Sequence, residues 1–179
     1  MQTMWTMRRK MAVLVMMLAT MVVLVGAADK EHRAVKETPA WKSQETLVGK
    51  WDGTVHEGSK DMPTRVEVRQ TGDGSALMHW MGEGTPYEMI TMFHPDGDDL
   101  LATHYCSAHN QPRMKLVSAT PARLVFEFKD GTNIGPHDGH MVGLAIDLID
   151  ANHHDEEWSW DQDGTRSASV FHYTRVAAK

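Results

Sequence analysis

The sequence contains a single cysteine, Cys106, among its 179 residues. An intramolecular disulfide is therefore excluded, and the packing of side chains must stabilise the fold. The sequence also lacks an apolar run of the about 20 residues that a membrane-spanning helix requires. The longest such run, from Met11 to Val25, is shorter and contains Thr20.

Helical periodicity is also missing over any useful length of the chain beyond this run, and there is no internal repeat or low-complexity segment. The segment from His140 to Ile149 comes nearest to a helix, but its apolar residues alternate with a period of two, which favours a strand. The sequence therefore excludes an all-helical domain, a coiled coil and a repeat array.

The N-terminal 28 residues are typical of a secretory signal peptide. Three basic residues, Arg8, Arg9 and Lys10, precede the apolar run, and small residues from Gly26 to Ala28 follow it. We therefore expect cleavage after residue 28 and a periplasmic or secreted protein, with an uncleaved anchor as the alternative. No cysteine follows the small residues, which argues against a lipid anchor.

Residues 29–179 then form one exported chain with a net charge of −9, because the chain carries −6 and the first 28 residues have three basic and no acidic side chains. Such a surface repels nucleic acid and anionic lipid head groups. We expect no nucleic-acid partner, no stable membrane anchor after cleavage, and a monomer. Residues 29–42 read as a polar linker, and residues 43–179 as one domain that begins with a helical turn from Ser43 to Gly49.

Short runs rich in Val, Thr, Phe, Tyr and Trp follow, separated by clusters of Gly, Pro and Asp that favour turns. About ten strands are predicted, near residues 50–57, 64–70, 75–82, 87–94, 99–107, 113–118, 122–129, 140–149, 154–161 and 166–176. Alternation within them predicts one buried face per strand. Ten hairpin-linked strands with one buried face close most simply as an all-β, antiparallel up-and-down barrel.

The first predicted strand carries a G-x-W-x-G motif formed by Gly49, Trp51 and Gly53. This motif resembles the opening strand of lipocalin and calycin barrels and of nitrobindin-like barrels, although Val55 stands where the latter have a third glycine. Segments 92–98, 103–106, 110–114 and 139–141 together resemble bacterial lipocalin-like proteins of unknown function. The resemblance implies that Trp51 closes the barrel floor with Arg175 against it, a favourable cation–π contact.

Strand phase suggests a pocket inside the barrel. Ala102, His104 and Cys106 share one face, which we take as inward, with Leu101, Thr103 and Tyr105 as the alternative inward set. The predicted pocket consists of a few polar groups in apolar surroundings, as in many small-molecule sites. Its candidate residues are His104, Cys106, His140, Trp158 and Trp160, with Asn110, Gln111 and Arg113 at one end. The alternative is that these histidines and tryptophans simply fill the core.

Other chemistries remain open alternatives. His104 and Cys106 could form a nucleophilic pair, but no helix N-terminus or elbow supplies an oxyanion hole. A buried histidine, His104 or His140, could ligate haem. The histidine and acidic residues of segments 137–140 and 153–157 match no metal-binding spacing, the latter falls at a predicted hairpin, and we expect no specific metal site.

The sequence thus predicts an exported barrel that binds a small, partly apolar molecule, with catalysis not assumed. A haem-binding barrel or a small enzyme that uses His104 and Cys106 is the first alternative. A filled barrel that binds other proteins is the second.

Overall fold

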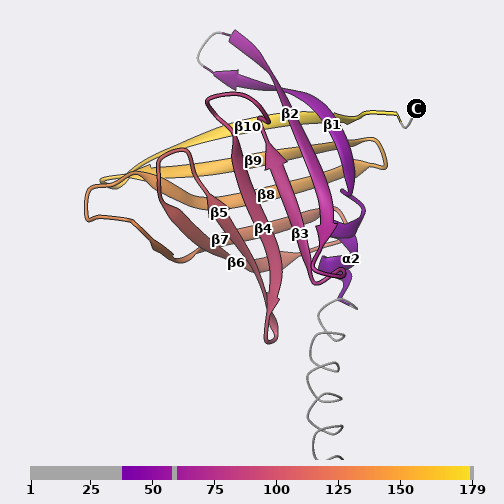
Figure 1. Ribbon diagram of the computed structural model, residues 1–179, viewed down its shortest axis with the longest axis horizontal. Coiled ribbons are helices and arrows are strands. Elements are labelled where there is room, and N and C mark those ends of the chain that lie inside the picture. The colour runs from indigo at the N-terminus through magenta and orange to yellow at the C-terminus, as the bar shows by residue number, and fades with distance from the viewer. Residues whose placement is uncertain (1–37, 58–59, 178–179) are drawn as a thin grey trace, which may run out of the picture.

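The computed structural model describes residues 38–57 and 60–177 (Figure 1). The predicted signal peptide lies outside the described residues. Among the helices of the described part, none is long and apolar enough to cross a membrane.

Ten antiparallel strands form a closed barrel in which each strand pairs with its neighbours in sequence and β1 pairs with β10. The strands are β1 (Gly49–Glu57), β2 (Lys60–Thr71), β3 (Ala76–Met81), β4 (Met89–Asp96), β5 (Asp99–Tyr105), β6 (Gln111–Ala119), β7 (Arg123–Thr132), β8 (His140–Asp150), β9 (His153–Gln162) and β10 (Thr165–Arg175). The predicted all-β up-and-down barrel is confirmed. Closure leaves no unpaired sheet edge, which would otherwise be open to pairing with another chain.

A single short helix, α2 (Pro39–Glu45), precedes the barrel in the described part of the chain. Thr38 caps it, because its side chain accepts a hydrogen bond from the Trp41 backbone N–H, and Pro39 occupies the first turn, where its missing N–H costs nothing. The predicted turn at Ser43–Gly49, capped by Ser43, was therefore placed too far along the chain. The helix also covers the last four residues of the expected linker.

One end of the barrel is closed by this helix, which lies beside the start of β1 (Figure 1). The Trp41 side chain is fully buried, and Leu47 is buried beside it in the core. Trp51 is also buried, and its indole N–H donates to the Leu47 carbonyl at 2.8 Å.

Arg175 at the end of β10 stabilises the same end of the barrel, which we call the floor. Its guanidinium lies 3.9 Å from the centroid of the Trp51 ring, and Trp51 and Arg175 are direct cross-strand partners. The same guanidinium donates to the carbonyls of Thr46, Val48 and Ala151. The forked geometry of arginine suits this arrangement, since one side chain satisfies several backbone acceptors.

Alternate residues of each strand fill the barrel interior. The buried apolar core includes Val66, Phe93, Phe126, Leu144 and Trp158. Register shifts between Met141 and Gly143 and between Arg113 and Met114 interrupt this alternation, as a β-bulge does.

Candidate functional site

Glu156 is the only acidic residue that is fully buried among the described residues, and it lies in the barrel core on β9. Its Oε1 atom lies 2.9 Å from His79 Nε2 and 3.2 Å from His154 Nε2. Its Oε2 atom accepts a hydrogen bond from the Trp158 indole N–H at 2.9 Å. Each carboxylate oxygen is therefore satisfied, as a buried charge requires.

Two strands from opposite halves of the sequence supply this cluster. His154, Glu156 and Trp158 alternate along β9 and so share its inner face. His79 comes from β3, where it lies between the buried residues Leu77 and Met81. The interaction therefore joins strands that are not neighbours in the barrel wall.

The protonation state of Glu156 follows from competing effects. Burial alone would raise its pKa, but the charge of His79 and the hydrogen bonds from His154 and His79 outweigh burial and hold the pKa well below its usual range. Glu156 is therefore ionised. Burial, followed by this negative charge, raises the pKa of Tyr173 well above its ordinary value, so Tyr173 keeps its proton.

His104 on β5 lies next to this cluster. Its ring packs against Trp158 with ring centroids 4.9 Å apart, and its Nδ1 atom lies 2.8 Å from the Thr91 hydroxyl. Burial lowers the pKa of His104 to about 4, with a further contribution from the charge of His79. The imidazole is therefore neutral near pH 7 and can donate or accept a hydrogen bond at its second nitrogen.

That second nitrogen, Nε2 of His104, is buried and has no hydrogen-bond partner among the described residues, and the same is true of Nδ1 of His154. A buried polar atom without a partner costs about 1–3 kcal/mol. Native proteins have few such atoms, and those that persist often belong to functional sites. We call His79, Thr91, His104, His154 and Glu156 the polar cluster.

The barrel end opposite α2 is walled by apolar side chains that are only partly buried. Met89, Met141 and Phe171 pack against the core in this way. Trp160 is also partly buried, and it follows Trp158 on the inner face of β9. Met89, Met141 and Trp160 lie on the strands between the polar cluster and the loops at that end, and Phe171 lies level with its cross-strand partner Glu156. We call these four residues the mouth.

The structure places the residues of the predicted pocket in different surroundings. His104 and Trp158 are buried together, and Trp160 lies at the mouth. Asn110 is buried in the β5–β6 loop, where its amide donates to the Gly139 carbonyl at 2.8 Å, while its Oδ1 atom has no partner in the described part of the chain. Gln111 is partly buried, and its side-chain oxygen accepts hydrogen bonds from Thr132 and Asn133.

Arg113 and His140 do not join His104. Arg113 projects to the outer wall and forms a two-pronged ion pair with Asp130, with contacts of 2.5 and 2.6 Å. Its strand neighbours Pro112 and Met114 are buried, so strand phase turns the Arg113 side chain outward. His140 is partly exposed at the start of β8, and its ring packs on Phe128 at 4.8 Å. The register shift after Met141 breaks the alternation that grouped His140 with Leu144.

Cys106 and His104 do not form a nucleophilic pair. Strand β5 ends at Tyr105, so Cys106 begins a turn, and its backbone N–H bonds the Asn110 carbonyl. One ring nitrogen of His104 bonds Thr91, and the other has no hydrogen-bond partner within residues 38–57 and 60–177. Neither nitrogen is therefore in hydrogen-bond contact with the thiol.

Haem does not fit the residues around His104. An axial ligand needs open space in front of the coordinating nitrogen, whereas Nε2 of His104 is buried and the ring is covered by Trp158. His140 is partly exposed, so a porphyrin there would lie largely in solvent. The described residues contain no group of three or more His, Cys, Asp or Glu side chains placed to hold a metal ion.

Sequence reasoning missed His79, Thr91, His154 and Glu156. The available signal was strand phase, since His154 and Glu156 share the parity of Trp158 and Trp160, both of which belong to the predicted pocket. The histidine and acidic residues of segment 153–157 instead suggested a hairpin in contact with solvent, although a strand is predicted from residue 154. Strand β9 begins at His153, so His154 and Glu156 lie inside the barrel.

The fold and the polar cluster define a closed ten-stranded β-barrel with an ionised carboxylate in its core, an architecture that fits a lipocalin-like barrel. No family model and no curated protein matches the chain. A solved protein of unknown function from the DUF3598 family of Nostoc punctiforme PCC 73102 matches 74% of this chain, with a TM-score of 0.53 and 14% identity. The match covers 48% of that protein, so this chain spans about half its length, and the likeness shows the fold alone.

The protein EF1p2_mFAP2b, solved bound to DFHBI, matches 76% of this chain and 99% of its own, at 13% identity. Its TM-score of 0.35 is too low to bear on function.

Proposed function

We propose that the protein binds a small, partly apolar molecule inside its barrel, with the polar group of that molecule hydrogen-bonded to His104. The observation that carries this proposal is the unpartnered Nε2 atom of His104, buried on an imidazole that is neutral near pH 7. A ligand group that bonded this atom would remove the cost of leaving it unsatisfied.

The charge of the polar cluster limits the ligand. Glu156 is already paired with His79 and His154, and the buried side chains of the described residues include no lysine or arginine, so a carboxylate or phosphate group would be buried there without a cation. A neutral group such as an alcohol, ketone or amide carries no such penalty. The preferred ligand is therefore a neutral amphipathic molecule with one hydrogen-bonding group.

Entry of such a ligand takes place through the mouth. The floor is closed by Trp41, Trp51 and Arg175, whereas Met89, Met141 and Phe171 are only partly buried. Methionine side chains adopt many conformations and repack readily around different shapes. Because Nε2 of His104 has no solvent contact, binding requires the mouth side chains to move aside.

A neutral ketone dye that fluoresces in apolar surroundings, such as prodan, tests this proposal directly. We expect saturable binding with a blue-shifted emission, and a weakening of about fivefold to tenfold in His104→Phe, the loss of one hydrogen bond of about 1 kcal/mol. Phenylalanine keeps the ring contact with Trp158, and thermal unfolding checks that the variant folds.

Exposed His109 supplies the matched control, because His109→Asn in the β5–β6 loop should bind the dye as the parent does. Asparagine tolerates the positive φ of this position. Absence of saturable binding would overturn the proposal and favour a barrel filled only by its own side chains. Equal binding by His104→Phe would also overturn it, because the dye would then bind without the His104 hydrogen bond.

A further inference from the structure

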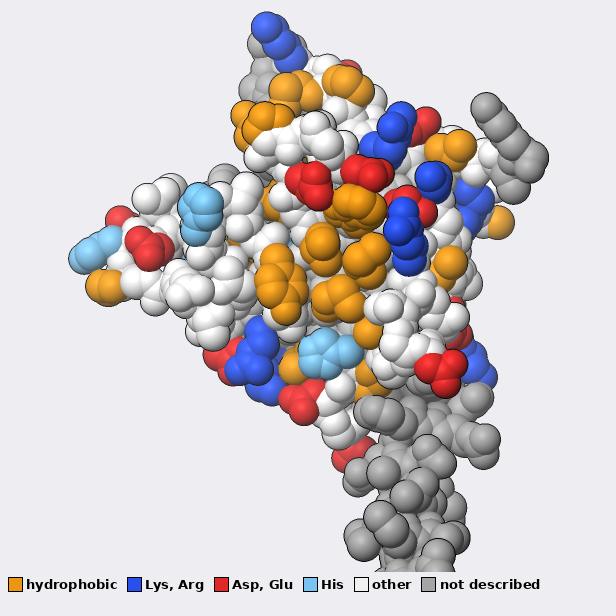
Figure 2. Space-filling view, viewed as in Figure 1, with side chains coloured by type: hydrophobic (Ala, Val, Ile, Leu, Met, Phe, Trp, Pro, Cys, Tyr) orange, Lys and Arg blue, Asp and Glu red, His pale blue; other side chains and the backbone are white. Residues whose placement is uncertain are grey.

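A second apolar feature lies on the outside of the barrel wall. Hydrophobic side chains gather over β3 and β4 on the face shown in Figure 2, bordered by charged residues. Within this patch lies a groove of about 420 Å³. Its lining residues are Met78, Glu88, Met89, Ile90, Met92 and Tyr105.

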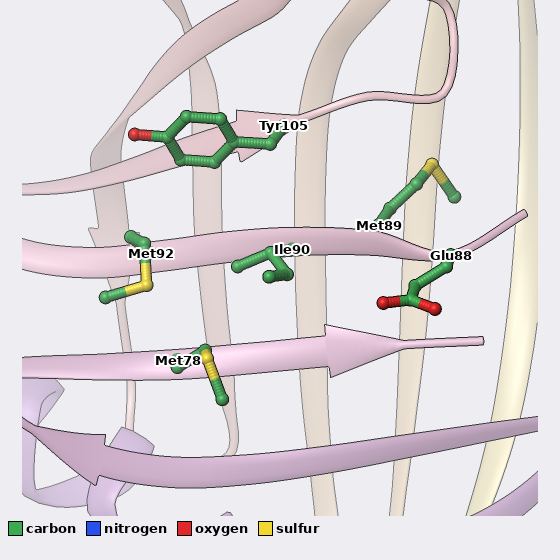
Figure 3. A pocket seen from close by; sticks show the side chains of 6 residues that line it. All are labelled: Met78, Glu88, Met89, Ile90, Met92 and Tyr105. Carbon is green, nitrogen blue, oxygen red and sulfur yellow. The ribbon is translucent and has the colours of Figure 1, made fainter. Parts of the chain in front are cut away.

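Three neighbouring strands build the groove. Met78 on β3 is the cross-strand partner of Met92 on β4, and Ile90 on β4 is the partner of Tyr105 on β5. Their side chains project from the same side of the sheet (Figure 3). Tyr105 is 50% exposed, so one face of a large aromatic ring is available at the groove. The walls are thus thioether, aliphatic and aromatic.

Glu88 is the only charged residue that lines the groove. Its carboxylate is held in place, since one oxygen accepts from the Trp80 indole N–H at 3.0 Å and the other from the Gly84 backbone N–H at 2.9 Å. Trp80 is itself fixed by the guanidinium of Arg69, which lies 5.2 Å from its ring centroid. Each carboxylate oxygen keeps a second lone pair for another partner.

The charge of Glu88 is not neutralised within the described part of the protein. Several other acidic residues on the outer wall have basic partners, as in the pairs Asp52–Arg65, Glu67–Arg69, Asp99–Lys115, Asp130–Arg113 and Asp147–Arg123. Among the ion pairs of the described residues, none involves Glu88. A fixed negative charge therefore stands at one end of an apolar groove without a cation.

We infer that this groove binds an amphipathic organic cation, an alkylammonium or arylammonium compound. Charge complementarity with Glu88 selects the cationic head, and an ammonium group is also attracted to the face of an aromatic ring such as that of Tyr105. The methionine and isoleucine walls cover the apolar body. The net charge of −6 on the chain favours approach of a cation and disfavours an anion. This groove lies on the outer wall and shares only Met89 with the mouth of the proposed interior site.

The test uses three amphiphiles with alkyl tails, each below its critical micelle concentration: decyltrimethylammonium, sodium decyl sulfate and the uncharged decyl maltoside. Binding is followed by calorimetry and by the emission of tryptophan. We expect the cation to bind at least tenfold more tightly than the other two. Glu88→Gln should remove most of this preference, and His104→Phe should leave it unchanged.

Glu83→Gln is the matched control, because it alters the net charge equally from an exposed position in the same loop. If Glu83→Gln weakens binding as much as Glu88→Gln, the attraction is only the overall charge and the inference fails. Equal binding of all three amphiphiles also overturns it. So does concentration-dependent self-association in sedimentation that Tyr105→Ala abolishes, because the groove would then be a contact between two copies.

Discussion

At the scale of single residues, the feature that sets this protein apart is a carboxylate in the core of a small barrel. Glu156 is satisfied by two histidines and a tryptophan, and the whole arrangement is removed from solvent. Such buried charges add little net stability while intact, but the loss of one partner leaves another without compensation.

Glu156→Gln should therefore destabilise the protein strongly. We expect a loss of about 3 kcal/mol in the free energy of unfolding, because the imidazoles of His79 and His154 lose the negative charge that they face. Urea denaturation at pH 7 measures this loss. The neighbour Glu157 faces outward with a 45% exposed side chain, and Glu157→Gln should change stability by less than about 0.5 kcal/mol. Equal effects of the two substitutions would contradict this account.

His104 makes stability depend on pH. Its pKa is lowered from 6.5 to about 4 in the folded protein, so the unfolded chain binds a proton more readily. The contribution of the neutral imidazole is present above pH 6.5 and is lost as the pH falls toward 4, by up to about 3 kcal/mol.

The difference in unfolding free energy between the parent and His104→Phe isolates this effect. We expect the parent to lose stability relative to the variant between pH 6.5 and pH 4, as measured by urea denaturation at half-unit steps. His109→Asn should run parallel to the parent. A constant difference between the parent and His104→Phe over this range would show that His104 is not buried in its neutral form.

At the scale of secondary-structure elements, the contacts between neighbouring strands determine which glycine positions could accept a larger residue. Gly53 on β1 is the cross-strand partner of Tyr173 on β10, and the Tyr173 ring occupies the space beside its Cα atom. A Cβ atom added at Gly53 would approach the His172 carbonyl to 2.4 Å and the Tyr173 ring to 2.5 Å. At Gly143 on β8 an added Cβ atom meets nothing nearer than 3.5 Å.

Gly53→Ala should consequently lower the melting temperature markedly, with a cost of about 3 kcal/mol, because the β1–β10 seam must open to accept the methyl group. Gly143→Ala should be neutral or slightly stabilising, since it only restricts the unfolded chain. Thermal unfolding by circular dichroism compares the two. A tolerated Gly53→Ala would mean that the seam is looser than these contacts indicate.

At the scale of the whole molecule, export remains a proposal that rests on residues 1–28. Expression of the full chain in a bacterium should deliver a periplasmic protein whose intact mass corresponds to residues 29–179. The same native spectrum would reveal a retained small molecule. A full-length mass in the membrane fraction would instead show that the apolar segment remains as an anchor.

Much of the architecture could be predicted from the sequence alone. The turn clusters and the two-residue alternation indicated ten strands and a closed barrel, because these signals depend on neighbours in the chain. The start of the helix was misplaced because Thr38 and Pro39 are stronger start signals than Ser43. The position of His140 was misjudged because a bulge shifts the side-chain phase by one residue without leaving a clear trace in the sequence.

The sequence by itself determined the number of strands, their order and the alternation of faces along each strand, although it left two possible inward faces open around His104. Only the tertiary structure decided which inward residues meet. His79 and Glu156 are 77 positions apart on strands that are not paired, and no periodicity can join them. They meet because closing the sheet turns every inner face toward one narrow interior, where a buried carboxylate must find its partners across the barrel.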